Sequence, residues 1–242
     1  MNQFFSIKKY SINSKVLKQD RNCFVCIPKD FENVELPSLY LLDGGENEKL
    51  EFVLKEISAL LAQKIIKPFI IIGIENIDRN YDFTNNTSIR KDRKWVPKYG
   101  NAKRFKNFII EELIPFVDSN FKTSENRTII GESLGGLLVL DIMYQHPKSF
   151  RQYIAVDPSL WWNNNELLNL FKTNYDVSLF DNIKICISSS KTVSIRNVTD
   201  IFHLWINDKI ENINYNYEID DIEDHFTIFK ANFSQIIKRC FN

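Results

Sequence analysis

The stretch Arg127-Thr-Ile-Ile-Gly-Glu-Ser-Leu-Gly-Gly-Leu-Leu-Val-Leu-Asp-Ile-Met-Tyr-Gln145 decides the fold. Its beginning, 127–130, is rich in the β-branched residues of a buried strand, and the apolar run 134–145 has the length of a helix. Only the short segment 131–133 separates the two, so the chain must turn sharply between them. A buried strand that turns directly into a helix is the repeating unit of a mostly parallel α/β sheet.

Strand and helix patterns alternate on both sides of this unit. Further strands are predicted at 4–10, 22–27, 38–42, 69–74, 153–156, 183–187 and 214–218, and further helices at 48–64, 105–117, 166–172, 194–205 and 226–239. Residues 75–100 are polar and turn-rich, and we interpret them either as a lid or pocket wall or as a solvated loop. Since no linker divides the chain, we predict a single α/β domain over 1–242, with a mostly parallel central sheet and helices on both faces.

The composition narrows the class of function. The chain has 31 Lys and Arg residues and 31 Asp and Glu residues, so its formal net charge is zero. It therefore lacks the positive charge that would attract nucleic acid or an anionic membrane. The apolar runs are too short to span a bilayer, and the first residues lack the apolar core that follows the basic start of a signal peptide. These features predict a cytoplasmic protein with no membrane or nucleic-acid partner.

The four cysteines, Cys23, Cys26, Cys186 and Cys240, are too few and too scattered for a disulfide framework. Cys23 and Cys26 have the spacing of a redox motif, but they lie in a predicted strand, where side chains three residues apart point to opposite faces. We therefore predict cysteines that belong to the core, a reduced chain and no metal site.

The turn at the centre of the deciding stretch is also the motif that carries chemistry. Gly131-Glu-Ser-Leu-Gly135 is a G-x-S-x-G sequence between a strand and a helix, which is the context of a nucleophile elbow, although a glycine-rich turn can also serve packing alone. A serine nucleophile needs a base that takes its proton. His225 lies between the last strand and the last helix, whereas His146 ends a helix and His203 lies within one. We predict Ser133 as nucleophile and His225 as base.

A carboxylate should orient this histidine, and two arrangements are open. The segment after the strand 183–187 is Ser188-Ser-Ser-Lys-Thr-Val193, which contains no acid. Asp157 ends the preceding strand and is the preferred third member; a Ser–His dyad is the alternative. The remaining acids in this half of the chain are expected to be solvated charges: Asp200, Asp221, Glu223 and Asp224.

Acyl transfer also needs hydrogen-bond donors for the oxyanion of its transition state. One predicted donor is the backbone N–H of Leu134, the residue after the nucleophile. The others are predicted at Gly44 and Gly45, because Asp43-Gly44-Gly45 follows a strand and leaves the backbone uncluttered. A plain Asp-Gly turn is the alternative.

Several segments together resemble one family. They are Tyr40-Leu-Leu-Asp-Gly44, Ile72-Gly-Ile74, Arg79-Asn-Tyr-Asp-Phe-Thr84, 108–116, Gly131–Gly136, Asp157-Pro-Ser-Leu-Trp-Trp162 and Asp224-His225. The chain resembles the esterase family of the α/β-hydrolases, which includes the esterase D-like enzymes and, nearest in these motifs, the esterases that open trilactone siderophores such as enterobactin. The resemblance implies an α/β-hydrolase fold and a serine esterase, with Ser133 as nucleophile and His225 as base, that acts on small-molecule esters without a cofactor.

The resemblance also bears on the pocket. It implies that Arg79 contacts the substrate and that Trp161 and Trp162 either line the site or belong to the core. Relatives usually carry an acid where this chain has 188–192 and a serine where it has Asp157, so either the acid has moved between strand ends or the enzyme is weakened. The expected substrates are siderophore-type or other small polar esters. Thioester cleavage, acyl transfer by the same groups and a non-catalytic binding module are the alternatives.

Overall fold

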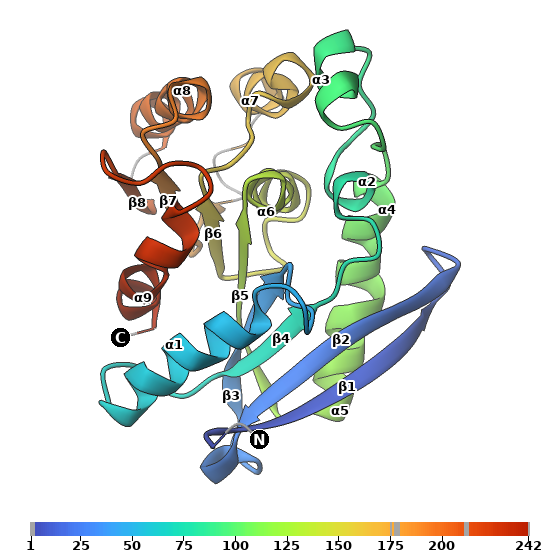
Figure 1. The fold of residues 1–242 in the computed structure, drawn as a ribbon, viewed down its shortest axis with the longest axis vertical. Coiled ribbons are helices and arrows are strands. Elements are labelled where there is room, and N and C mark those ends of the chain that lie inside the picture. The colour runs from blue at the N-terminus through green and yellow to red at the C-terminus, as the bar shows by residue number, and fades with distance from the viewer. Residues whose placement is uncertain (1–2, 175, 177–179, 211–212, 242) are drawn as a thin grey trace.

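The computed structural model describes residues 3–174, 176, 180–210 and 213–241, and its strands form an eight-stranded sheet. In sheet order they are β1 (Phe5–Ser14), β2 (Gln19–Pro28), β4 (Ile70–Ile74), β3 (Leu36–Leu42), β5 (Thr123–Glu132), β6 (Gln152–Val156), β7 (Lys184–Ser189) and β8 (Asn214–Ile219). β2 pairs antiparallel with both β1 and β4, and the strands from β4 to β8 are parallel to one another. The prediction of a mostly parallel sheet is confirmed (Figure 1).

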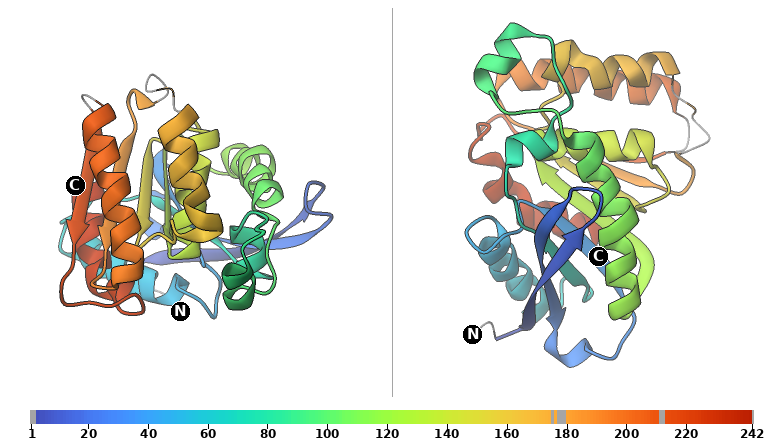
Figure 2. Two further views of the ribbon diagram at one scale, coloured as in Figure 1. Left: turned by 90° about the horizontal axis from the view of Figure 1, so that it is seen from above. Right: turned by 90° about the vertical axis from the view of Figure 1, so that its right-hand side faces the viewer.

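Helices cover both faces of the sheet (Figure 2). They are α1 (Leu50–Ala62), α2 (Arg79–Phe83), α3 (Arg90–Trp95), α4 (Ala102–Asn107), α5 (Ile114–Asn120), α6 (Leu134–Gln145), α7 (Trp162–Asn174), α8 (Val193–Lys209) and α9 (Ile228–Cys240). Alternate residues of β3 point to opposite faces, so that Leu41 packs with α1 and α9 while Tyr40 packs with α4 to α8. None of the described helices combines the length and the apolar character needed to cross a bilayer.

The two cysteines of β2 follow the same alternation. Cys23 belongs to the core beneath α4 to α8, and Cys26 belongs to the core beneath α1 and α9. Both thiols are buried, and burial raises the pKa of each to about 12. Their predicted placement on opposite faces of a strand is confirmed, and this geometry prevents them from acting as a redox pair.

β4 is buried along its whole length. Its packing explains why Gly73 interrupts an otherwise aliphatic run. A Cβ atom on Gly73 would lie 2.3 Å from the carbonyl oxygen of Gly44, which is closer than any side chain tolerates. The loop after β3 therefore rests directly on the backbone of β4, and this contact fixes the position of the loop.

The predicted helix at 105–117 is longer and less regular than its periodicity indicates. It runs as α4, a π-helical turn at Phe108–Leu113 and α5. Pro115 accounts for the change, since proline lacks the N–H that a regular helix uses and its ring clashes with the preceding turn. The π-helical turn ends just before it and leaves Pro115 in the first turn of α5.

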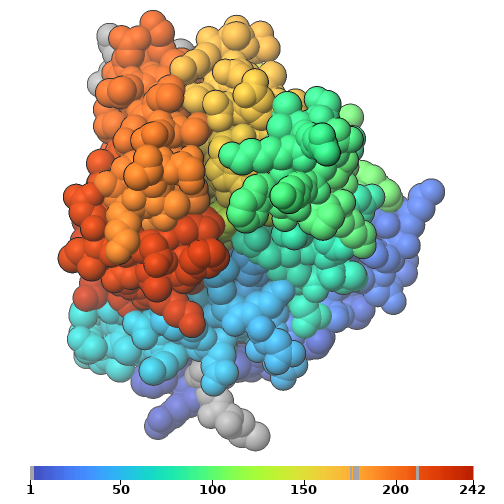
Figure 3. All heavy atoms as spheres, turned by 45° about the horizontal axis from the view of Figure 1, so that its top comes forward, coloured from blue at the N-terminus to red at the C-terminus, as the bar shows by residue number. Residues whose placement is uncertain are grey.

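The segment 75–100 carries α2 and α3 and packs on the rest of the protein. Asp82 forms a buried ion pair with Arg21 at 2.7 Å, and Asp92 accepts the backbone N–H of Asn163 at 2.7 Å. In Figure 3 the segment, in green, lies against α7, in yellow. These contacts differ from the expectation for a solvated loop, because they pack the segment against the rest of the protein.

The three consecutive asparagines at 163–165 form a kink at the start of α7. Their φ angles are 49°, 56° and 59°. Asparagine is enriched in this left-handed region because its short side chain can hydrogen-bond to the local backbone. The kink turns the chain so that α7 packs across α6 and α8.

Candidate active site

Ser133 occupies a strained turn between β5 and α6. Its φ and ψ angles are 60° and −120°, a region that residues with a Cβ rarely adopt. Backbone hydrogen bonds hold it there: Ser133 donates its N–H to the carbonyl of Val156 at 2.9 Å, and its own carbonyl accepts the N–H of Ser159 at 3.0 Å. A Cβ atom on Gly131 would lie 2.5 Å from the backbone of Gly135, so the motif needs glycine to make this turn.

A chain of hydrogen bonds joins the three residues predicted as nucleophile, base and acid. Nε2 of His225 lies 2.9 Å from Oγ of Ser133, and Nδ1 of His225 lies 2.7 Å from Oδ2 of Asp157. His225 lies in the segment between β8 and α9, where its backbone N–H donates to Oγ1 of Thr192 at 3.1 Å. Residues from three separate loops thus meet at the carboxyl ends of the parallel strands, where open α/β sheets place their sites.

The other two histidines lie elsewhere. His203 is on α8, where its ring nitrogens lie 3.1 Å from the hydroxyl of Tyr215 and 3.2 Å from the amide of Asn207. His146 follows α6 directly, and its backbone N–H closes the last turn of that helix. Of the three histidines, His225 is the one that the structure places beside Ser133.

Asp157 is fully buried, and the end of β7 supplies its hydrogen bonds. Ser190 donates its backbone N–H to Oδ1 and its hydroxyl to Oδ2, both at 2.8 Å, and the hydroxyl of Ser189 lies 3.5 Å from Oδ1. The carboxylate therefore comes from the end of β6, while the acid-free segment 188–192 after β7 holds it in place. Sequence reasoning did not assign Ser190 a role, although the run of three serines at a strand end was the available signal.

A second hydroxyl lies beside the nucleophile. Oγ of Ser159 is 3.3 Å from Oγ of Ser133, and its side chain is buried. Ser159 follows Asp157 in the same loop, so one segment supplies both the carboxylate and this hydroxyl. No motif or regular spacing in the sequence relates Ser159 to Ser133, so the sequence does not predict their contact.

The predicted oxyanion donors have different surroundings. The N–H of Leu134 is in the first turn of α6, where backbone donors have no partner within the helix. Gly44 instead donates its N–H to the carbonyl of Ile74 at 2.9 Å, because the loop after β3 continues its contact with β4. Gly45 donates its N–H to Oε2 of Glu48 at 2.6 Å. The structure thus contradicts Gly44 as an oxyanion donor, and Gly45 can donate only if it releases Glu48.

A cluster of charged side chains surrounds the turn on the side of β3 and β4. Arg79 binds the buried Asp43 through two hydrogen bonds, of 2.7 Å and 3.1 Å, and donates a third to the carbonyl of Glu132 at 3.0 Å. Lys49 lies 2.9 Å from the same aspartate and 3.1 Å from the Glu132 carboxylate. Burial opposes the charge of Asp43, but Arg79 and Lys49 outweigh it and hold its pKa below the ordinary value. Arg79 therefore ties the loop after β3 to the residue before the nucleophile.

Glu132 directly precedes Ser133 and is largely buried. Burial raises the pKa of its carboxyl above the ordinary value, and the nearby Lys49 partly offsets this effect. The residue before the nucleophile thus carries a carboxyl group whose charged form is disfavoured by burial.

The tandem tryptophans have mainly packing contacts. Trp162 is 2% exposed, and its indole N–H donates to the carbonyl of Asn85 at 3.1 Å. Trp161 is partly buried against the same core, with its ring centroid 5.9 Å from that of Trp162. Of the two alternatives for Trp162, lining the site or belonging to the core, its burial agrees with the core.

Replacing Arg79 with glutamine is expected to lower the free energy of unfolding by about 1–2 kcal/mol, since it leaves a buried carboxylate with one cation fewer. The value stays below that of a fully buried pair because Arg79 is 32% exposed. Urea denaturation measures the change. Arg93→Gln is the control: this exposed arginine donates to the carbonyl of Ser88, and its loss should change stability by less than about 0.5 kcal/mol. Equal effects of the two substitutions would contradict the importance of the Arg79–Asp43 contact.

Known proteins resemble this chain in sequence and in fold. A family model described as "Putative esterase" matches residues 14–195. The ferri-bacillibactin esterase BesA of Bacillus subtilis is 35% identical over 158 residues, which are 59% of this chain and 54% of BesA. The siderophore enterobactin esterase of Emericella nidulans is 41% identical over 73 residues, which are 29% of this chain and 24% of that esterase. The match to this chain thus covers about half of the first relative and about a quarter of the second.

A solved structure extends the likeness to the fold. The BES protein from Bacillus cereus aligns with a TM-score of 0.83 at 22% sequence identity, over 98% of this chain and 96% of that protein. The α/β architecture described above is therefore shared along nearly the full length of both chains.

Proposed function

This chain belongs to the esterase family whose model matches residues 14–195, and from this premise we propose that it hydrolyses carboxylic esters through an acyl-enzyme on Ser133. One observation carries the proposal: an unbroken series of hydrogen bonds runs from Oγ of Ser133 through the ring of His225 to the buried carboxylate of Asp157. This series has the connectivity by which a serine hydroxyl is activated for attack on an acyl carbon.

In the proposed mechanism Ser133 attacks the acyl carbon while Nε2 of His225 takes its proton. Asp157 holds the ring so that Nδ1 carries the other proton, and its negative charge stabilises the imidazolium that forms. The backbone N–H of Leu134 donates to the oxyanion. The imidazolium then protonates the departing alcohol, and His225 next removes a proton from the water that attacks the acyl-enzyme.

Small polar esters of the siderophore type are the proposed substrates. The names of BesA and of the enterobactin esterase support this substrate class, since both relatives are siderophore esterases. Arg79 remains partly exposed beside the nucleophile turn, which supports a contact with an anionic or polar part of the substrate. The partner is accordingly a small molecule.

The test uses three kinds of acyl substrate with the purified protein: short-chain p-nitrophenyl esters, a trilactone such as enterobactin, and an acyl thioester. A fluorophosphonate probe reports the nucleophile independently, because it labels an activated serine without any choice of substrate. The proposal requires ester turnover and labelling of Ser133. A folded sample that neither turns over esters nor accepts the probe would contradict it, and turnover of thioesters alone would replace the ester with a thioester as substrate.

Ser159→Ala is expected to lower kcat by about 3- to 10-fold with little change in KM. Its hydroxyl approaches Oγ of Ser133 and helps to hold that atom, and the loss corresponds to about one neutral hydrogen bond. Steady-state kinetics on a p-nitrophenyl ester separates the two constants. Ser159→Thr keeps the hydroxyl and should retain more activity than the alanine variant. A rise in KM at constant kcat would instead assign Ser159 to substrate binding.

A further inference from the structure

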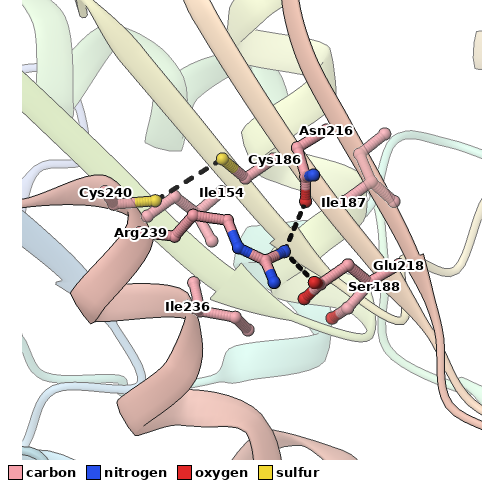
Figure 4. A pocket seen from close by; sticks show the side chains of 9 residues that line it. All are labelled: Ile154, Cys186, Ile187, Ser188, Asn216, Glu218, Ile236, Arg239 and Cys240. Carbon is pink, nitrogen blue, oxygen red and sulfur yellow. Dashed lines mark hydrogen bonds and ion pairs between the residues drawn. The ribbon is translucent and has the colours of Figure 1, made fainter.

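Cys186 and Cys240 form a pair of thiols behind the candidate active site. Cys186 lies in β7 and Cys240 is the last residue of α9, and their sulfur atoms are 3.4 Å apart although 54 residues separate them in sequence. Figure 4 shows the two side chains pointing toward one another across a small pocket. Neither cysteine takes part in the proposed ester hydrolysis.

The surroundings of this pair favour a thiolate on one member. The hydrogen bond between the two thiols lowers the pKa of Cys186 to about 7 against the effect of burial, with help from the nearby Lys184 and Arg239. The amide of Gln152 adds a contact of 3.8 Å to the same sulfur. The pKa of Cys240 is raised by the same hydrogen bond and by burial. The pair is thus asymmetric, with Cys186 as the more reactive sulfur.

The pocket beside the sulfur atoms gives a small molecule access to them. Its volume is about 10 Å³, on the scale of one water molecule. The guanidinium of Arg239 lies over it and binds Asn216 at 3.0 Å and the carboxylate of Glu218 (Figure 4). Cys186 is 6% exposed, whereas Cys240 is only partly buried. The cavity is too small for a bulky disulfide such as oxidised glutathione, so a small oxidant of the hydrogen peroxide type has to approach the pair from the side of the partly exposed Cys240.

We propose that Cys186 and Cys240 are a peroxide-sensitive dithiol that is oxidised to a disulfide between β7 and α9. Bond formation shortens the separation of the sulfur atoms from 3.4 Å to about 2.05 Å. The proposal concerns the two cysteines that lie outside the predicted strand of Cys23 and Cys26, and it does not depend on the ester substrate.

One peroxide molecule completes the oxidation. The Cys186 thiolate attacks one oxygen of hydrogen peroxide, the O–O bond breaks, and hydroxide leaves, so that Cys186 becomes a sulfenic acid. The Cys240 sulfur then attacks the Cys186 sulfur and the S–O bond breaks; the departing hydroxide takes up the Cys240 proton to form water. The first hydroxide is neutralised by the proton that Cys186 released on ionising. Each cysteine is oxidised by one electron, and the peroxide is reduced to two waters.

The disulfide would link two elements that position the candidate active site. β7 leads to the serines that hold Asp157, and α9 follows the segment that carries His225. Closing a loop of 54 residues restricts the unfolded chain, so the midpoint of thermal unfolding is expected to rise on the order of 10 °C. Ester hydrolysis at room temperature should be unchanged, because the native contacts around Ser133 stay in place.

The experiment treats the reduced full chain with hydrogen peroxide, removes the peroxide, unfolds the chain in denaturant with N-ethylmaleimide so that every remaining free thiol is blocked, and maps the peptides without reduction. We expect a linked peptide that contains Cys186 and Cys240, while Cys23 and Cys26, whose thiols are buried, are recovered as N-ethylmaleimide adducts. Thermal unfolding of the same samples should show the rise, and dithiothreitol should reverse it. Failure to form the linked peptide, or equally fast oxidation of Cys23 and Cys26, would overturn the proposal.

Two variants test the order of the chemical steps. In Cys240→Ser, peroxide should leave a sulfenic acid on Cys186 that dimedone traps, because the resolving thiol is missing. In Cys186→Ser, Cys240 should react with peroxide at least about tenfold more slowly, since burial still raises the pKa of its thiol when the partner sulfur is gone. Equal dimedone labelling of the two variants would contradict the assigned asymmetry. The result for the unmodified chain stands whether or not either variant folds.

Discussion

Replacing Ser133 with alanine is expected to lower kcat/KM for esters by at least about 10⁴-fold. The substitution removes the proposed nucleophile and the acceptor of the 2.9 Å contact with His225, and it leaves the backbone hydrogen bonds of the turn unchanged. Hydrolysis of p-nitrophenyl acetate and of a trilactone measures the loss, and labelling by a fluorophosphonate should disappear with it.

A matched variant at the same position separates chemistry from folding. Ser133→Gly also lacks the hydroxyl, but glycine adopts a φ of 60° without strain, so it should raise the free energy of unfolding by about 1 kcal/mol relative to the alanine variant. Both variants should be equally inactive despite their different stabilities. If wild type and Ser133→Ala hydrolysed every ester at the same rate while both stayed folded, the proposed mechanism would be wrong.

Asp157→Asn is expected to lower kcat by about 10³- to 10⁴-fold with a small effect on KM. The amide oxygen of asparagine can still accept the backbone N–H of Ser190, but the amide no longer stabilises the imidazolium and does not enforce the required tautomer of His225. Steady-state kinetics between pH 6 and 9 measures the effect. Asp221→Asn is the control, because this acid pairs with Arg196 at the surface and its loss should leave kcat within about twofold.

A double variant tests whether the carboxylate can act from the neighbouring strand end. The hydroxyl of Ser190 lies 2.8 Å from the carboxylate oxygen that contacts His225. Asp157→Ser combined with Ser190→Asp therefore transfers the carboxylate from the end of β6 to the end of β7 and keeps it near the histidine. We expect the double variant to regain at least about tenfold over Asp157→Ser alone. If Asp157→Asn retained activity within tenfold of wild type, the Ser–His dyad would become the better description.

The sequence predicted the features that depend on local pattern. The nucleophile turn follows from Gly131 and Gly135, whose backbones nearly touch, and the strand and helix that flank it were visible as apolar runs. His225 could be found because it lies between the last strand and the last helix, a position that the order of elements brings to the carboxyl edge of the sheet.

Features that depend on contacts between distant segments were only partly predictable. Asp157 is a candidate acid in the sequence because it ends a strand. The hydrogen bond from Ser190 that holds its carboxylate exists only because β6 pairs with β7, and a single sequence does not show this pairing. The N–H of Gly44 donates to the carbonyl of Ile74, which lies on a neighbouring strand. Because the two residues are far apart in the chain, the sequence around Gly44 does not show that this donor is already used. Whether Trp162 lines the site or belongs to the core cannot be predicted for a similar reason. It contacts Asn85 in the segment 75–100, and this segment has no periodic pattern of apolar residues from which its packing could be predicted.

The close contact between Gly44 and Gly73 has a consequence for directed evolution of substrate range. A side chain at Gly73 would push the loop that carries Asp43, and through Arg79 the displacement would reach the residue before the nucleophile. Libraries that aim at new substrates should therefore keep both glycines invariant.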